Sequence, residues 1–184
     1  AWGNNAFPDA PLIGHILCRE RLLREGDALL EKQREDPERY ADVRLCPPDL
    51  TFDRGMAIDA GGFTVALHHL PGHTRDCIVA HVPEHDLLLA GDCAEEPIPL
   101  LYHGPLDRWI AALRSWDDPA RVRTVIPSHG PVSGRDLLTR NADYLASLLA
   151  GRAGGWQPAP DTPAFYRDAH AHNLQRAATL LGTD

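Results

Sequence analysis

The chain has 184 residues and a formal net charge of −8, from 26 acidic and 18 basic residues. This length suffices for one domain with a hydrophobic core, and the composition is typical of a soluble globular protein. The acidic balance without an arginine-rich cluster argues against a nucleic-acid or anionic-membrane partner and favours a small-molecule substrate. No apolar stretch reaches the roughly 18–20 residues that span a bilayer. The compartment stays undetermined, with a cytoplasmic location favoured.

The hydrophobic pattern predicts a mixed α/β order in a single domain over residues 1–184, with hairpins early and strand-helix alternation late. The opening AWGNNAFPDAPLIGH reads as a turn before a short buried strand. A Gly/Pro-rich connector, residues 154–163, precedes the last helix. The remaining predicted elements, in chain order, are a helix over 18–40 that is continuous or broken near Gly26, a hairpin over 50–70 turning at Gly61-Gly62, strands in 77–83 and 85–92, a helix over 105–118, a strand in 123–130, and helices over 134–151 and 164–181.

Four cysteines are scattered along the chain with no C-x-x-C pair, so neither a zinc knuckle nor a disulfide framework is indicated. We expect all four to be free thiols.

Three polar residues share one local context. His73 in LPGHT, Asp92 in LLLAGD and His129 in VIPSHG each follow an apolar strand run and lie beside a glycine. Strand ends are rigid positions from which loops direct ligands into a common cleft. Neutral imidazole suits zinc and iron, and a carboxylate can bridge two cations. Each residue alone is more often a turn or surface residue, but together they favour a metal site.

The segments HHLPGHT, LLLAGDCAEE and VIPSHGPV, in this order and spacing, resemble the later metal motifs of the metallo-β-lactamase superfamily. The resemblance covers almost the whole chain. It implies an αββα sandwich with one or two metal ions at an edge of the sheets, zinc first and iron or manganese as alternatives. By this resemblance His73 binds the first ion, Asp92 bridges both, and His129 binds the second.

The chain departs from the family pattern because it has no H-x-H-x-D-H loop, which supplies most of the remaining ligands. That loop normally stands just before a segment resembling AWGNNAFPDAPLIGH. We therefore expect this chain to be the C-terminal two-thirds of the fold, in a truncated, cleaved or incompletely recorded form. Open strand edges would then favour a complementing N-terminal fragment or a homo-oligomer.

Further residues near the motifs are candidates for supporting roles. Asp76, three residues after His73, is either an outer-shell partner that orients a ligand or a simple turn aspartate. His103 is expected to line the cleft, and His172 either reaches a pocket or is a solvated residue of the final helix. Glu95 and Glu96 follow Asp92 and could steady the loop or touch substrate, but the default for both is a solvent-facing charge.

A complete site of this kind predicts a metal-dependent hydrolase, in which Asp92 is catalytic and a metal-bound hydroxide attacks an ester, lactone, thioester or amide-type bond. No Ser/His/Asp arrangement or G-x-S-x-G elbow suggests a side-chain nucleophile. Two alternatives stay open. One is a mononuclear iron enzyme similar to the family's sulfur dioxygenases, which would use His73 and Asp92, and the other is a metal-free binding or structural module.

Overall fold

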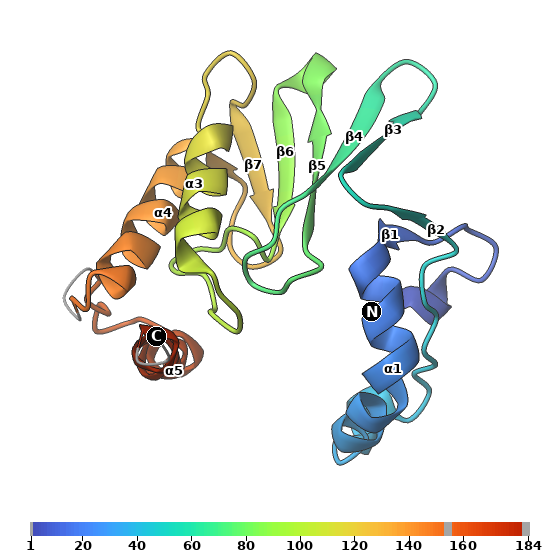
Figure 1. Ribbon diagram of the computed structural model, residues 1–184, viewed down its shortest axis with the longest axis horizontal. Coiled ribbons are helices and arrows are strands. Elements are labelled where there is room, and N and C mark those ends of the chain that lie inside the picture. The colour runs from blue at the N-terminus through green and yellow to red at the C-terminus, as the bar shows by residue number, and fades with distance from the viewer. Residues whose placement is uncertain (1, 153–155, 182–184) are drawn as a thin grey trace. The chain divides into compact units, whose positions relative to one another are not determined.

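The computed structural model describes residues 2–152 and 156–181, which form two compact units, residues 1–54 and 55–184 (Figure 1). The predicted single domain over 1–184 stays a prediction. Gly154 and Gly155, at the start of the predicted connector, lie outside the described residues. Across the described parts of the chain, no helix combines the length and the apolar character needed to cross a bilayer.

The first unit pairs two short strands beside a long helix. Its elements are the 3-10 helix η1 (Asn4–Ala6), β1 (Ile13–His15), α1 (Ile16–Gln33), α2 (Pro37–Tyr40) and β2 (Leu50–Phe52), and β1 pairs with β2 in parallel. The expected turn and short strand at the start are confirmed. Of the two alternatives for residues 18–40, the break near Gly26 is not found, because α1 runs unbroken through Gly26, which is buried where a Cβ would come within 2.8 Å of Leu45. The continuous helix is found only as far as Gln33. The break lies before Pro37, since a proline disfavours helical backbone in the residue preceding it.

The second unit is built on one six-stranded sheet, in the spatial order β3-β4-β5-β6-β7-β8. The hairpin and the later strands lie in the segments in which strands were predicted, which confirms that prediction. All neighbouring pairs are antiparallel except β6 and β7, which are parallel and are connected through a helix. The strands are β3 (Gly55–Asp59), β4 (Thr64–His69), β5 (Ile78–Val82), β6 (Leu87–Gly91), β7 (Thr124–Pro127) and β8 (Ser133–Gly134), with the 3-10 helix η2 (Pro83–His85) between β5 and β6.

Three helices complete this unit: α3 (Leu106–Trp116), α4 (Asp136–Leu149) and α5 (Ala164–Leu181), all in the predicted segments. In Figure 1, α3 and α4 lie side by side next to β7. The apolar residues of α3 recur every three or four positions, so they form one face that packs against the sheet. The fully buried residues of this shared core include Val79, Leu88, Val125, Trp109, Leu113, Leu137 and Leu145.

Close packing between Gly72 and Trp109 joins α3 to the loop after β4. The Trp109 side chain is fully buried, and its indole N–H donates to the Cys93 carbonyl at 3.0 Å. A Cβ on Gly72 would lie only 2.5 Å from the indole ring. The loop can therefore approach the helix only because residue 72 has no side chain, and this approach fixes the backbone immediately before His73.

We expect Gly72→Ala to lower the free energy of unfolding by about 1–3 kcal/mol, because the added methyl group forces the Trp109 ring to shift in a packed core. Thermal or urea unfolding measures the change. Gly3→Ala is the matched control, since a Cβ there meets no atom within 4 Å. Equal stability of the two variants would contradict the packing argument.

Candidate metal centre

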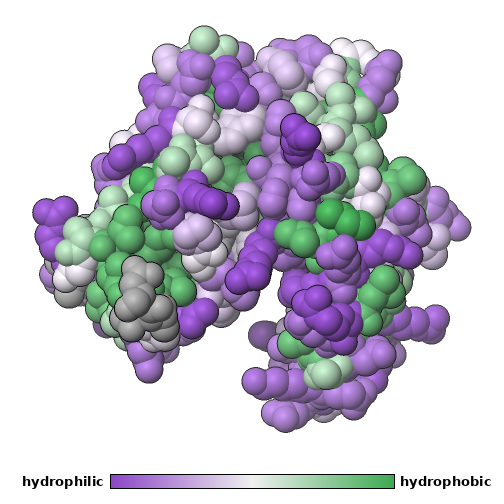
Figure 2. Space-filling model, viewed as in Figure 1, coloured by the Kyte–Doolittle hydropathy of each residue, from purple (hydrophilic) through white to green (hydrophobic). Residues whose placement is uncertain are grey.

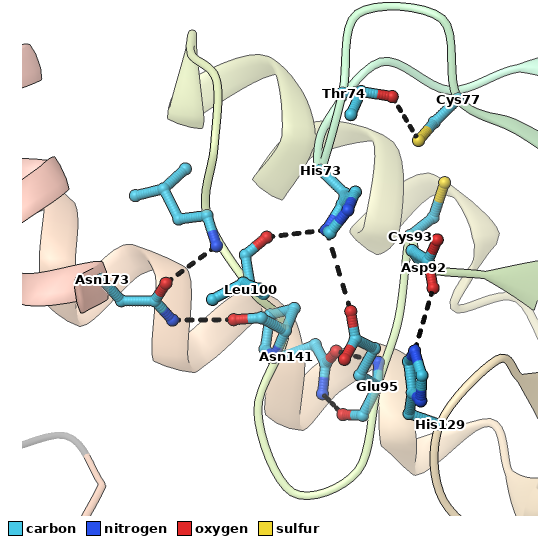
Figure 3. A network of polar contacts seen from close by, with 12 residues as sticks. His73, Thr74, Cys77, Asp92, Cys93, Glu95, Leu100, His129, Asn141 and Asn173 are labelled. Atoms are coloured by element: carbon cyan, nitrogen blue, oxygen red, sulfur yellow. Dashed lines mark hydrogen bonds and ion pairs between the residues drawn. The ribbon is translucent and has the colours of Figure 1, made fainter. Parts of the chain in front are cut away.

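Strand direction brings the three predicted ligands to one edge of the sheet. β4 and β6 are both antiparallel to β5, so they run in the same direction, and β7 is parallel to β6. The carboxyl ends of these three strands therefore share one edge. His73 lies in the loop after β4, Asp92 directly follows β6, and His129 lies two residues after β7. The resulting cluster is drawn in Figure 3.

Asp92 and His129 are near neighbours. The Asp92 Oδ1 atom lies 3.6 Å from His129 Nε2, and their side chains are 40% and 57% exposed. His73 is more enclosed, with a side chain that is 15% exposed. Its imidazole interacts electrostatically with both Asp92 and His129. Asp92 and His129, on the loops after β6 and β7, are thus neighbours that are open to solvent, and His73 is a partly buried residue near enough to interact electrostatically with both.

A backbone carbonyl orients the His73 ring. His73 Nδ1 lies 2.9 Å from the carbonyl oxygen of Leu100. A carbonyl oxygen only accepts hydrogen bonds, so Nδ1 must carry the proton and Nε2 of a neutral ring keeps its lone pair. Burial lowers the pKa of His73, although the Asp92 carboxylate and the Leu100 hydrogen bond act in the opposite direction. The neutral ring with a free Nε2 is the form that ligates metal ions.

The Leu100 segment is itself held by a buried amide on α5. Asn173 is fully buried, and its side chain accepts from the Leu101 N–H at 2.8 Å and donates to the Pro99 carbonyl at 2.8 Å (Figure 3). Tyr144 of α4 accepts a further hydrogen bond from Asn173 at 3.0 Å. Since a buried amide with unmet hydrogen bonds is costly, this arrangement holds the residues on both sides of Leu100 in one conformation.

A second buried amide, Asn141 of α4, holds the loop that follows Asp92. Its side-chain oxygen accepts from the Glu95 N–H at 2.8 Å, and its NH₂ group donates to the Glu95 carbonyl at 2.9 Å. Asn141 has no exposed surface. The loop after Asp92 is also joined directly to the loop that carries His129, because the Glu96 N–H donates to the His129 carbonyl at 3.1 Å. Helix α4 thereby fixes the backbone on which Asp92 lies.

Glu95 corrects the expectation of a solvent-facing charge, because its side chain is only 2% exposed. Its Oε1 atom lies 3.8 Å from His73 Nδ1. Burial, with a smaller effect of the Asp92 carboxylate, raises the pKa of Glu95 to about 7. The sequence signal was weak, since two adjacent glutamates after a strand are typical of a surface loop. Only the packing of α4 over this loop buries the first of them.

Glycine at position 130 allows the His129 loop to lie against Glu96. Gly130 has a φ of +108°, which L side chains rarely adopt, and a Cβ there would lie 2.6 Å from the Glu96 Cβ. The position after His129 in the sequence motif therefore requires a glycine, because a side chain there would collide with Glu96. It lets two loops from different strands meet beside the candidate site.

The three candidate supporting residues occupy different surroundings. Asp76 is buried and acts electrostatically on His73. His172 Nε2 lies 3.0 Å from the Leu101 carbonyl and its ring packs against Tyr102, so it contacts the same loop from α5. His103 lines a separate pocket. The predicted roles of Asp76, His103 and His172 stay predictions.

The thiols near the site are free, as predicted for all four cysteines. The Cys77 Sγ atom lies 3.0 Å from the Thr74 hydroxyl, and the Cys93 thiol donates to the Leu70 carbonyl at 3.5 Å. Cys93 is fully buried beside Asp92. The hydrogen bond between the two thiols lowers the pKa of Cys77, against the opposite effect of burial, and the same hydrogen bond together with burial raises the pKa of Cys93.

The donor set suits a transition metal ion. Two imidazoles and one carboxylate are ligands that zinc and iron(II) prefer, and His73 has the hydrogen-bonded Nδ1 that ligating histidines usually show. Within residues 2–152 and 156–181, however, no group of three or more His, Cys, Asp or Glu side chains is gathered closely enough to hold an ion. The assignment of His73, Asp92 and His129 as metal ligands therefore stays a prediction, although the three side chains lie near one another.

The six-stranded sheet with its flanking helices, and the His/Asp/His cluster at the strand ends, define a protein of the metallo-β-lactamase fold class. The family model of the metallo-beta-lactamase superfamily matches residues 1–129. The chain belongs to this superfamily, which confirms the predicted resemblance.

Curated relatives with sequence similarity are named acyl-coenzyme A thioesterase MBLAC2. The chain is 28% identical to the Bos taurus and Homo sapiens proteins over 124 residues, which are 61% of this chain. It spans about 40% of the length of these relatives. The predicted complementing N-terminal fragment or homo-oligomer stays a prediction.

Solved structures of the superfamily share the fold. A metallo-beta-lactamase family protein from Thermus thermophilus aligns with a TM-score of 0.66 and 20% identity, covering 97% of this chain and 69% of the other. An archaeal superfamily protein from Sulfolobus tokodaii aligns with a TM-score of 0.62 and 17% identity, covering 91% and 70%. At this level of identity the likeness establishes the fold, and the predicted fold class is confirmed.

We expect Asn141→Ala to lower the free energy of unfolding by about 1–3 kcal/mol or more, because it leaves the buried backbone groups of Glu95 without partners. Chemical unfolding measures this change. Asp143→Ala on the same helix is the control, since it removes only an exposed ion pair with Arg114 and is expected to cost less than about 1 kcal/mol. Similar losses in both variants would mean that Asn141 does not hold the loop.

Proposed function

We propose that this chain is the part of a metal-dependent thioester hydrolase that carries His73, Asp92 and His129. The observation that carries the proposal is the His73 ring, whose Nδ1–H donates to the Leu100 carbonyl, so that Nε2 keeps the lone pair with which we propose that His73 binds a cation together with Asp92 and His129. Superfamily membership adds the expectation of metal chemistry. Zinc is the ion that we propose first, with iron or manganese as alternatives.

The three proposed ligands differ in how far they are exposed to solvent, and we propose a different role for each. His73 is the enclosed ligand, since the Leu100 carbonyl and the nearby Glu95 carboxyl surround its Nδ1 side. Asp92, whose Oδ1 atom lies 3.6 Å from His129 Nε2, is proposed to contact one ion or to bridge two. His129 is the exposed ligand on the solvent side. Zinc bound at such a site in proteins lowers the pKa of a water molecule to about 7 and polarises a carbonyl group.

Thioesters are the proposed substrates because of the named activity of the relatives, which are acyl-coenzyme A thioesterases. A thioester carbonyl is electrophilic, and a thiolate is a good leaving group because the pKa of a thiol is only about 8.5, so a side chain that protonates the leaving group is not essential. We propose that the candidate metal ligands at the edge of the sheet orient this carbonyl.

The metal assignment predicts that His73→Ala, Asp92→Asn and His129→Ala each weaken zinc binding by at least about tenfold, because each removes one ligand atom. Equilibrium dialysis with metal analysis measures the affinity. His85→Ala is the control, since His85 lies in the exposed η2 turn at the opposite end of β6. Unchanged zinc affinity in all three ligand variants would contradict the site.

Binding of one iron ion with oxygen consumption would favour the dioxygenase alternative, and no metal binding would favour the metal-free module.

The activity predicts that the zinc-loaded chain releases a free thiol from an acyl-coenzyme A thioester, as followed with a thiol reagent. We expect a chelator to abolish the release, added zinc to restore it, and Asp92→Asn to lower kcat by at least about a hundredfold, since removing one electrostatic contact to the transition state commonly costs that much. Thiol release that is insensitive to chelation and to Asp92→Asn would rule out this function.

A further inference from the structure

A pocket of about 450 Å³ lies beside the candidate metal centre and is part of no site described above. Its lining combines apolar and basic side chains, and Figure 2 shows apolar surface gathered around the end of α5. The lining residues that matter are the apolar Leu149, Leu180 and Leu181 and the basic Arg75, Arg176 and His103.

The chain connects this pocket closely to the metal centre. Arg75 follows His73 by two residues, so their Cα atoms are at most about 7 Å apart. Tyr102 is a second link, because its ring packs edge-on against His73 with centroids 4.9 Å apart. The Tyr102 carbonyl accepts a hydrogen bond from Arg176 Nε at 2.8 Å. A substrate whose reacting carbonyl lies at His73 therefore has the pocket as a neighbouring place for another of its groups.

The two guanidinium groups are available to a ligand. Among the described residues no carboxylate pairs with Arg75 or Arg176, and the Arg75 side chain makes no hydrogen bond there. Arg176 uses Nε for Tyr102 and keeps its two terminal NH₂ groups. The described lining of the pocket contains one carboxylate, Asp107, so two arginines and one aspartate give it a formal charge of +1 with His103 neutral. The whole chain, by contrast, carries −8.

Phosphate is the anion that this arrangement fits best. Guanidinium groups present several N–H donors in a planar fork that matches phosphate oxygens, and two of them can share one doubly charged group. The first turn of α3, residues 105–107, also lines the pocket and adds the partial positive charge of a helix N-terminus. The leucine side chains that line the pocket suit an apolar part of the same molecule.

We propose that Arg75 and Arg176 bind a phosphate group of the carrier from which the acyl group is cleaved, so that the substrate is a thioester of a phosphorylated carrier. This inference rests on the proposed function, and it names the part of the substrate that the metal ligands do not contact. Arg75 supplies a free guanidinium, and Arg176 both binds the phosphate and stays joined to the loop of Tyr102.

The test measures binding of coenzyme A and of pantetheine, which lacks its phosphates, to the metal-free chain by titration calorimetry. We expect coenzyme A to bind at least about tenfold more tightly, because charge-assisted hydrogen bonds to phosphate contribute at about this level. Arg75→Ala should lose about tenfold or more in coenzyme A affinity and leave pantetheine affinity unchanged. Arg114→Ala is the control, since Arg114 is an exposed arginine of α3 paired with Asp143.

Arg75 is exposed, and its side chain has no hydrogen-bond or ion-pair partner among the described residues, so Arg75→Ala keeps the contact of the Arg75 carbonyl with His69 and is expected to fold normally, as a thermal unfolding scan verifies. Equal binding of coenzyme A and pantetheine, or coenzyme A binding that is unaffected by Arg75→Ala, would overturn the inference. Metal-free binding separates the two proposals. Binding that depends on Arg75, in a zinc-loaded chain that cleaves no thioester, would support the pocket and reject the proposed function. Cleavage without dependence on Arg75 would reject the pocket alone.

Discussion

The common direction of β4, β6 and β7 is the constraint on which the candidate site depends. Because these three strands run the same way, the residues that follow them emerge at one edge of the sheet, which brings His73, Asp92 and His129 to the same edge. Reversal of any one strand would place its loop at the opposite edge. The parallel β6–β7 pair needs the α3 crossover, and the buried face of α3 in turn presses Trp109 against the loop that carries His73.

Two buried asparagines convert this shared edge into a defined arrangement of loops. Asn141 and Asn173 come from different helices, and each accepts from a backbone N–H and donates to a backbone carbonyl in the loop region after β6. The cost of leaving a buried amide unsatisfied makes such contacts selective for one loop conformation. In that conformation the Leu100 carbonyl faces His73, so Asn173 of α5 influences the candidate ligand through the loop that it holds.

The charges around the site follow a spatial division. Carboxyl groups of Asp76, Asp92 and Glu95 surround His73, and together they suit a cation. The neighbouring pocket carries Arg75 and Arg176 and suits an anion. A substrate with an electrophilic carbonyl and a separate phosphate group would satisfy both regions at once. Such a division is unexpected from the net charge of the chain, because net charge averages over surfaces that a ligand experiences separately.

Most elements of the fold could be predicted from hydrophobic periodicity, since strands and amphipathic helices carry their pattern locally. The helix over 164–181 and the hairpin at Gly61-Gly62 are found where the pattern placed them. The sequence left open whether the first helix is continuous or broken near Gly26, because a glycine inside a helical pattern is compatible with both when its packing partner, Leu45, is not known.

For the site, sequence by itself determined the identity of the candidate ligands, because each stands at the end of a recognisable strand with a glycine beside it. Tertiary structure alone decided their supports. The burial of Glu95, the contact of Leu100 with His73, and the presence of Arg75 and Arg176 in one pocket all depend on segments far apart in the chain or on the packing of α4 and α5. Contacts of this kind leave no local pattern in the chain, since they arise only when the helices pack against the loops.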